Sequence, residues 1–163
     1  MKRVFSIIML FLTAIYMADA KVEPAPVFAG HMVLQQQTDA ALWGKAKPES
    51  KVTITTSWSK AKTVVSTDAE GKWFARVATP AAGGPYEITF SDGEKLTLKN
   101  VLIGEVWICS GQSNMEMQMK GFKGQPVEGS TDLILGAKPW TPIRSCNLKR
   151  VKSFETQDEC EAT

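Results

Sequence analysis

One serine stands out because of the residues on either side of it. Ser113 lies in the stretch GQSNM, from Gly111 to Met115. This stretch begins at the last residue of the apolar run Val101–Gly111. A continuous apolar run is typical of a buried strand, and the carboxyl edge of such strands is where α/β folds bind ligands. Gly111 would permit a sharp turn, and the amides of Ser113 and Asn114 would be free to donate if a helix begins here. The pattern is compatible with a serine nucleophile beside part of an oxyanion-stabilising site.

The same residues leave a purely structural role for Ser113 open. The nucleophile turn of the α/β-hydrolases requires Gly-x-Ser-x-Gly, and Met115 occupies the position of the second glycine. A serine hydroxyl is also a poor nucleophile until a base accepts its proton. His31 is the one histidine of the 163 residues, and it precedes the predicted strands, where we expect a surface or turn position for it.

Short alternating segments lie between His31 and Ser113. Each has β-branched or aromatic residues at every second position and is bounded by turn-forming residues such as Ala82–Pro85. The predicted strands are Val52–Trp58, Thr63–Asp68, Lys72–Ala78, Tyr86–Phe90 and Lys95–Val101. Their even spacing predicts a β-sandwich over residues 21–100. We expect its three tryptophans to lie in the core, with a sugar-binding aromatic platform as the alternative; they are Trp43, Trp58 and Trp73.

The pattern changes after Asn100. The run Val101–Gly111 predicts a strand covered on both faces, Ser130 is a candidate N-cap for a short helix, and Ile143–Val151 reads as a further strand. An α/β domain is therefore expected to begin near residue 101 and to be unfinished at Thr163. A sheet stopped after two strands would leave apolar side chains uncovered, among them Val106, Trp107 and Ile108. The predicted fold class is mixed β and α/β.

The small net charge argues against a nucleic-acid-binding protein, and the amino-terminal residues predict an exported one. The formal net charge is +2, and no basic run interleaved with aromatics suggests a nucleic-acid partner. Lys2 and Arg3 precede the apolar run Val4–Met17, and Ala18-Asp19-Ala20 follows it. This is the pattern of a signal peptide over residues 1–20, cleaved after Ala20, and it predicts a secreted or periplasmic protein. The run is shorter than the roughly 20 residues that a membrane-spanning helix needs, so we expect no stable anchor after cleavage.

The cysteines and the single histidine indicate neither a metal site nor a cofactor. The chain has three cysteines, which are Cys109, Cys146 and Cys160. Their odd number and their spacing fit neither a disulfide framework nor a zinc site, and the sequence does not determine which of them, if any, are paired. A thiol enzyme that uses Cys109 is a weaker hypothesis than a serine enzyme, because a cysteine within an apolar strand normally behaves as a small hydrophobe.

The longer sequence GEVWICSGQSNMEM resembles the sialate O-acetylesterase family. Members of this family are secreted carbohydrate esterases of the SGNH-hydrolase class. The resemblance includes GHMVLQQ before it, MKGFKGQPVEGS after it, and NLKRVKS and QDEC near the end. It implies that Ser113 attacks the acetyl carbonyl of an O-acetylated sugar, with sialic acid as the first expectation. It also implies that Ser113 itself, Gly111, Gln112 and Asn114 stabilise the oxyanion or orient the substrate. Residues 101–163 would then begin an SGNH-type, flavodoxin-like α/β domain.

The sequence departs from the family where the base is concerned. The family's base is a histidine in a downstream Asp-x-x-His segment; this chain contains no such segment, and His31 matches a structural position. We therefore expect an incomplete esterase domain over 101–163 and an inactive chain. Lys120, Lys123 and Arg144 are candidates to meet a sialate carboxylate, although solvated charges are the simpler expectation. A non-catalytic carbohydrate-binding or scaffold sandwich and an acetylxylan-type esterase are the alternatives, and the oligomeric state is left open.

Overall fold

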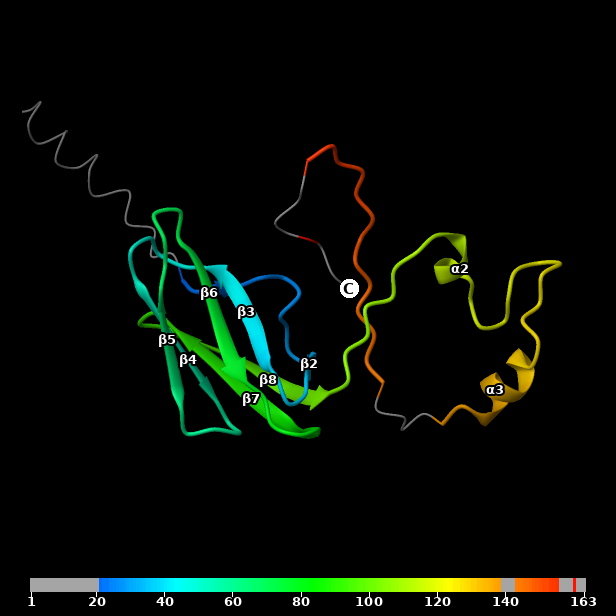
Figure 1. The fold of residues 1–163 in the computed structure, drawn as a ribbon, viewed down its shortest axis with the longest axis horizontal. Helices are drawn as coiled ribbons and strands as arrows, with labels where there is room; N and C mark the ends of the chain where they lie inside the picture. Colours follow the sequence, from blue (N-terminus) through cyan, green and yellow to red (C-terminus); the bar gives the residue numbers. More distant parts are fainter. Residues whose placement is uncertain (1–20, 139–142, 156–159, 161–163) are drawn as a thin grey trace, which may run out of the picture.

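The computed structural model describes residues 21–138, 143–155 and 160. The predicted signal peptide at 1–20 and most of the QDEC stretch lie outside these residues. The described part of the chain forms two β-sheets and two short helices (Figure 1). None of its helices has the length and apolar character needed to cross a membrane.

The strands occupy the first part of the described chain. They are β1 (Glu23–Pro24), β2 (Val33–Gln35), β3 (Asp39–Lys45), β4 (Lys51–Thr56), β5 (Lys62–Ser66), β6 (Lys72–Ala78), β7 (Gly83–Ser91) and β8 (Lys95–Gly104). One sheet has the order β1-β3-β6 and is antiparallel throughout. The other has the order β2-β8-β7-β4-β5 and is antiparallel except where β2 runs parallel to β8. The larger sheet is therefore mixed and the smaller one antiparallel, and the β-rich part of the predicted fold class is found in residues 21–104.

The hydrophobic core lies between the two sheets. Strand β6 alternates strictly, with Trp73, Ala75 and Val77 buried and the residues between them exposed, because successive side chains of a strand point to opposite faces. Its buried face meets that of the larger sheet, and the rings of Trp73 and Phe90 lie with their centroids 5.5 Å apart. Trp73 is thus a core residue as predicted, whereas Trp43 is 38% exposed and the core prediction for it is wrong. Trp58 is partly buried against the edge of the core.

The five strands predicted before residue 101 correspond to β4–β8, and the bounds of Lys72–Ala78 coincide with those of β6. The turn predicted at Ala82–Pro85 is wrong. Strand β7 begins at Gly83, and its pairing with β8 shifts register between Gly83 and Tyr86, which is how a bulge keeps turn-forming residues within a ladder. Strand β3, Asp39–Lys45, is not predicted from the sequence, because its two alanines and its glycine have low strand propensity.

The two strands predicted after residue 100 are not found as predicted. Strand β8 includes Val101 and Ile103 and ends at Gly104, and residues 105–111 form no strand. Trp107 and Ile108 are 83% and 93% exposed, so the apolar side chains expected to be uncovered are uncovered. The described residues 143–151 form no continuous strand either. A buried parallel strand needs paired neighbours and covering layers, and nothing in the described part supplies them to these segments.

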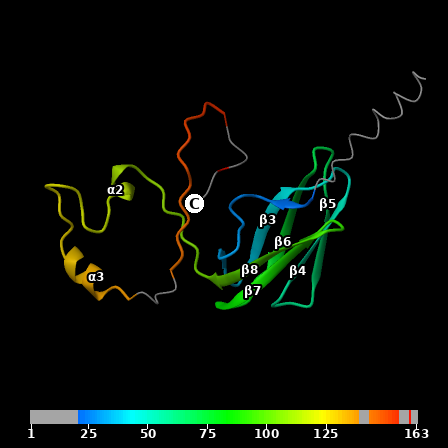
Figure 2. The same cartoon turned by 180° about the vertical axis from the view of Figure 1, so that it is seen from behind.

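Two short helices follow the strands, α2 (Ser113–Glu116) and α3 (Ser130–Gly136). The helix predicted after Ser130 is confirmed, although its N-cap is Gly129 and Ser130 is the first helical residue. Figures 1 and 2 show both helices on the far side of the orange-red segment 143–155 from the strands. Any site that includes α2 is therefore held against the sheets by the connecting segments and not by packing of the helix on a sheet.

Candidate active site

Ser113 is the first residue of α2, and its side chain is exposed. The turn is closed by the Met115 amide, which donates to the Gln112 carbonyl at 2.9 Å. In a helix that starts at Ser113, the amides of Ser113 and Asn114 belong to the first turn, where backbone donors have no intrahelical acceptor. The structure thus places the serine hydroxyl and two backbone donors together at an exposed turn. The turn follows an irregular segment after the end of β8, so the predicted position of Ser113 at the carboxyl edge of a strand is wrong.

Gly111 has a different role from the one predicted. It does not adopt a positive φ, so no left-handed turn requires a glycine there. A Cβ added at Gly111 would lie 2.6 Å from Cγ of Met115. The glycine therefore makes room for the Met115 side chain as it folds back over the start of α2. Gly111 and Gln112 are both exposed and contiguous with Ser113.

The structure does not bring Ser113 and His31 together. His31 lies in the turn before β2 with φ of 69°, and its Nδ1 lies 2.7 Å from Nδ2 of Asn100. The predicted turn position of His31 is confirmed. Within the described residues, no hydrogen bond involves the hydroxyl of Ser113. Cys109 is exposed and unpaired, contrary to the buried strand position expected for it, and Cys146 and Cys160 are also free thiols.

Glu105 holds the start of the segment that leads to Ser113. Its carboxylate accepts hydrogen bonds from Nε2 of Gln35 at 3.1 Å and from Nε2 of Gln36 at 2.6 Å. In return, Oε1 of Gln35 accepts from the Val106 amide at 2.8 Å. The end of β2 therefore fixes the direction in which the chain leaves β8. No local pattern in the sequence indicates this contact, although the glutamines and Glu105 belong to the stretches that carry the family resemblance.

The free energy of unfolding in mild acid should depend on the hydrogen bonds that the Glu105 carboxylate accepts. The hydrogen bonds from Gln36, and next those from Gln35, lower the pKa of Glu105 below its usual value. A carboxyl with a lowered folded-state pKa stabilises the protein above its unfolded-state pKa of about 4.3, and this contribution is lost as the pH falls through the folded-state pKa. We expect Glu105→Gln to flatten the decline of unfolding free energy below about pH 4.3, measured by urea titration at several pH values. Glu87→Gln, on exposed strand surface, is the control; a Glu105→Gln profile identical to the unchanged chain would contradict the assignment.

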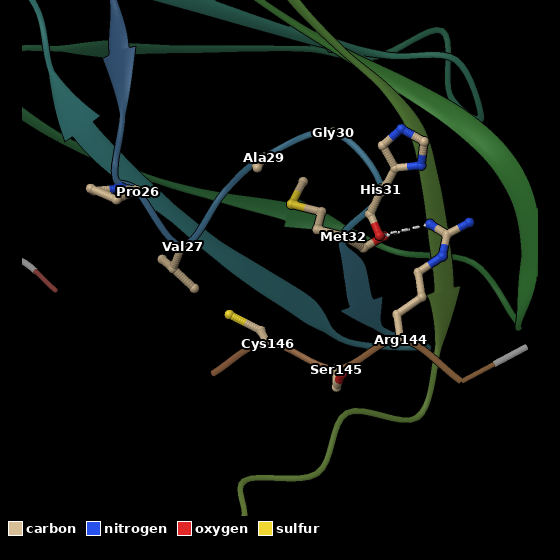
Figure 3. Close-up of a pocket in the computed structure, with 9 residues that line it drawn as sticks. All are labelled: Pro26, Val27, Ala29, Gly30, His31, Met32, Arg144, Ser145 and Cys146. Carbon is tan, nitrogen blue, oxygen red and sulfur yellow. Dashed lines mark hydrogen bonds between the residues drawn. The ribbon is translucent and has the colours of Figure 1, made fainter. Parts of the chain in front are cut away.

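Arg144 fastens the segment 143–155 to the sheets. Its Nη1 donates to the carbonyl oxygens of Asn100 at 2.6 Å, His31 at 2.8 Å and Met32 at 3.3 Å, and its Nη2 donates to Oδ1 of Asn100 at 3.0 Å. Figure 3 shows the guanidinium turned toward the turn before β2, beside a cavity of ≈ 460 Å³. The guanidinium is therefore neither a solvated charge nor free for a sugar carboxylate. Farther along, Arg150 forms an ion pair with Glu116 of α2.

Lys120 and Lys123 lie in the connection between α2 and α3, and both are exposed. They match the simpler expectation of loop charges. The segment 143–155 consequently contacts both the sheet region, through Arg144, and the helix that carries Ser113, through Arg150.

Removing the guanidinium of Arg144 should release this segment. Arg144→Ala leaves several carbonyl groups without their charged donor, and we expect a loss of about 1–3 kcal/mol and faster hydrogen exchange in residues 143–155. Arg144→Lys should recover only part of the protection, because an ammonium cannot reproduce the planar fork. Lys152→Ala in the same segment is the control. Unchanged exchange in Arg144→Ala would show that the arginine does not hold the segment.

Part of this chain is similar in structure to part of a carbohydrate acetylesterase. A crystal structure of such an enzyme from Xanthomonas citri aligns with this chain with a TM-score of 0.55 and 32% sequence identity, over 60% of this chain and 22% of that one. The structure is thus similar to one segment of a carbohydrate acetylesterase.

Curated relatives make the similarity more specific. The chain is 31% identical to sialate O-acetylesterase from Mus musculus over 139 residues, which is 79% of this chain and 25% of the relative. It is 38% identical to the proteins of that name from Homo sapiens and Pongo abelii over 96 residues, which is 53% of this chain and 18% of each relative. Comparison with models of known protein families finds no match. The resemblance to sialate O-acetylesterases is confirmed, and the chain spans a quarter or less of their length.

Proposed function

We propose that this chain supplies the nucleophile of a carbohydrate O-acetylesterase, with Ser113 as the attacking residue. One observation carries the proposal: the GQSNM serine stands exposed at a backbone turn with donors beside it, in a chain 31–38% identical to sialate O-acetylesterases. The substrate is an acetyl ester of a sugar. Sialic acid is the first expectation from the relatives' name, and an acetylated xylose unit is the alternative.

The reaction divides into two acyl transfers. Oγ of Ser113 attacks the acetyl carbonyl, its proton passes to a base, and the sugar hydroxyl leaves as an acetyl–serine ester forms. Water then attacks that ester, releases acetate and restores the serine. We assign the Ser113 amide to stabilising the oxyanion, and Gly111, Gln112 and Asn114 to shaping the site and orienting the substrate.

The base for this reaction is not assigned to His31. The ring of His31 lies against Asn100 in the turn before β2, and the sequence contains no second histidine. We propose that the base lies outside these residues and that the chain by itself is inactive. A serine without its base retains only the small rate that oriented donors provide.

The proposed organisation has three parts. Residues 1–20 are a cleaved signal peptide for a secreted or periplasmic protein, with no lasting membrane anchor and no nucleic-acid partner. The region 21–100 is a β-sandwich whose last strand extends to Gly104, supported by the core shared between two sheets. The region 101–163 is the beginning of an SGNH-type, flavodoxin-like α/β domain. The exposed apolar residues Val106–Ile108 support this, because such a run is suited to a covered strand.

A chimaera tests the proposal. This chain would replace the aligned segment of the Xanthomonas citri acetylesterase, of which it covers 22%. We expect the folded chimaera to release acetate from O-acetylated sialic acid or acetylated xylo-oligosaccharide, while the purified chain alone releases none above background. Comparing the two substrates would identify the sugar. A folded chimaera that is inactive on both would contradict the proposed function.

A further inference from the structure

The outer face of the three-stranded sheet carries an exposed aromatic pair. Trp43 of β3 and Phe74 of β6 are directly opposite each other in register, and they are 38% and 55% exposed. Residues directly opposite in an antiparallel pair have Cβ atoms roughly 5 Å apart, so their side chains adjoin. The inward positions beside them, Leu42 and Trp73, already supply the core. Trp43 contacts the ring of Phe28 and Phe74 contacts the guanidinium of Arg76, yet both rings keep an exposed surface.

The pair lines a groove with a polar rim. The groove has a volume of ≈ 520 Å³ and is bounded by β1, by the end of β3 and by the start of β6. Its rim combines two acidic and two basic side chains, which are Glu23, Asp68, Lys45 and Lys72. Hydrogen-bonding groups of both kinds thus surround an aromatic floor, which is the composition of a small-ligand site.

The walls of the groove are fixed in the unliganded protein. The ring of Phe28 packs edge-on against Trp43 with centroids 4.6 Å apart and an interplanar angle of 79°. Nε1 of Trp73 donates to the Lys45 carbonyl at 3.1 Å, and Oδ1 of Asp68 accepts from the Lys72 amide at 2.7 Å. A site whose walls are already ordered loses less entropy when a ligand binds.

We propose that this groove binds a sugar ring of a glycan, at a position separate from Ser113. A pyranose has an apolar face of C–H groups and a rim of hydroxyls that both donate and accept. It can lie on the rings of Trp43 and Phe74 while its hydroxyls meet the ammonium and carboxylate groups of the rim. The two carboxylates in the rim would repel a polyanion such as nucleic acid, so a sugar ring fits the groove better. The preference for a sugar over other polar ligands of the same size rests on the proposed function.

The site is distinct from the candidate active site. Figure 1 shows β3 and β6 on one side of the segment 143–155 and α2 on the other. The groove would therefore hold a glycan without occupying the serine turn. In this arrangement it acts as an anchoring site for a polymeric or branched substrate and takes no part in ester cleavage.

Calorimetric titration of the purified chain with xylohexaose and with sialyllactose tests the proposal. Neither sugar carries an O-acetyl ester, so the result does not depend on whether the protein is an esterase. We expect at least one sugar to bind, and Trp43→Ala and Phe74→Ala each to weaken it about tenfold, the loss expected for one aromatic contact. Trp43→Phe should remain within about threefold, because an aromatic surface is kept.

Val64→Ala is the matched control, since Val64 is as exposed as Phe74 at 55% but lies on β5 of the other sheet. It should bind as the unchanged chain does, and circular dichroism of every variant would establish that the fold is retained. Absence of binding by both sugars at millimolar concentration would overturn the proposal. Binding that Trp43→Ala and Phe74→Ala leave unchanged would overturn it as well.

Discussion

Replacing Ser113 by alanine should lower acetate release by the acetylesterase chimaera by roughly 10⁴- to 10⁶-fold. The covalent route requires a nucleophile at this position, and the substitution removes the oxygen that would carry the acetyl group. Backbone donors such as the Ser113 amide are retained in Ser113→Ala, so a small residual rate over the uncatalysed reaction is expected. Substrate binding should change little, which places the loss in kcat and not in KM. Acetate release under saturating and limiting substrate measures the two separately.

Ser110→Ala is the matched control for this prediction. Ser110 lies three residues before Ser113, is also exposed, and belongs to the irregular segment that connects β8 to α2. Its replacement should leave acetate release within a few-fold of the chimaera, since no role in the site is assigned to it. Trapping an acetyl group on Ser113 by mass spectrometry after rapid acid quench would give direct support. A Ser113→Ala chimaera that retains most of its kcat would exclude the serine as nucleophile.

Truncating Phe90 should cause the largest loss of stability. Phe90 is fully buried in β7 and contacts Trp73 of the opposite sheet. Phe90→Ala would remove much of the contact between the sheets and leave a cavity, at a cost of about 3–5 kcal/mol. A domain of this kind has about 5–15 kcal/mol of total stability, so the variant would unfold at much lower denaturant concentration. Guanidinium titration followed by tryptophan fluorescence measures the change.

Phe74→Ala makes the same chemical change on the outer face of the small sheet. Phe74 is 55% exposed and lies beneath the guanidinium of Arg76, 5.6 Å from the ring centroid. Its truncation should cost about 1 kcal/mol or less, because little apolar area is lost from the core and the cation–π contact is exposed. Equal losses in Phe90→Ala and Phe74→Ala would show that the two sheets do not share a core.

Local patterns in the sequence located most of the strands. Alternation of apolar and polar residues is a direct consequence of strand geometry, so β4–β8 could be placed before any contact was known, with bounds in error by a few residues at most ends. The same reasoning failed at Val101–Gly111. Its apolar run is typical of one strand, but β8 ends at Gly104 and residues 105–111 pair with no strand of the described chain.

By itself, the sequence determined the serine turn, the resemblance to sialate O-acetylesterases and the absence of a second histidine. These depend on residue types and on neighbours along the chain, which a sequence contains directly. Only the tertiary structure placed the carboxylate of Glu105 against Gln35, 70 residues earlier, and the guanidinium of Arg144 on Asn100, 44 residues earlier. It also turned Trp43 outward to join Phe74. Contacts over such separations follow from strand order and register, which no local pattern specifies.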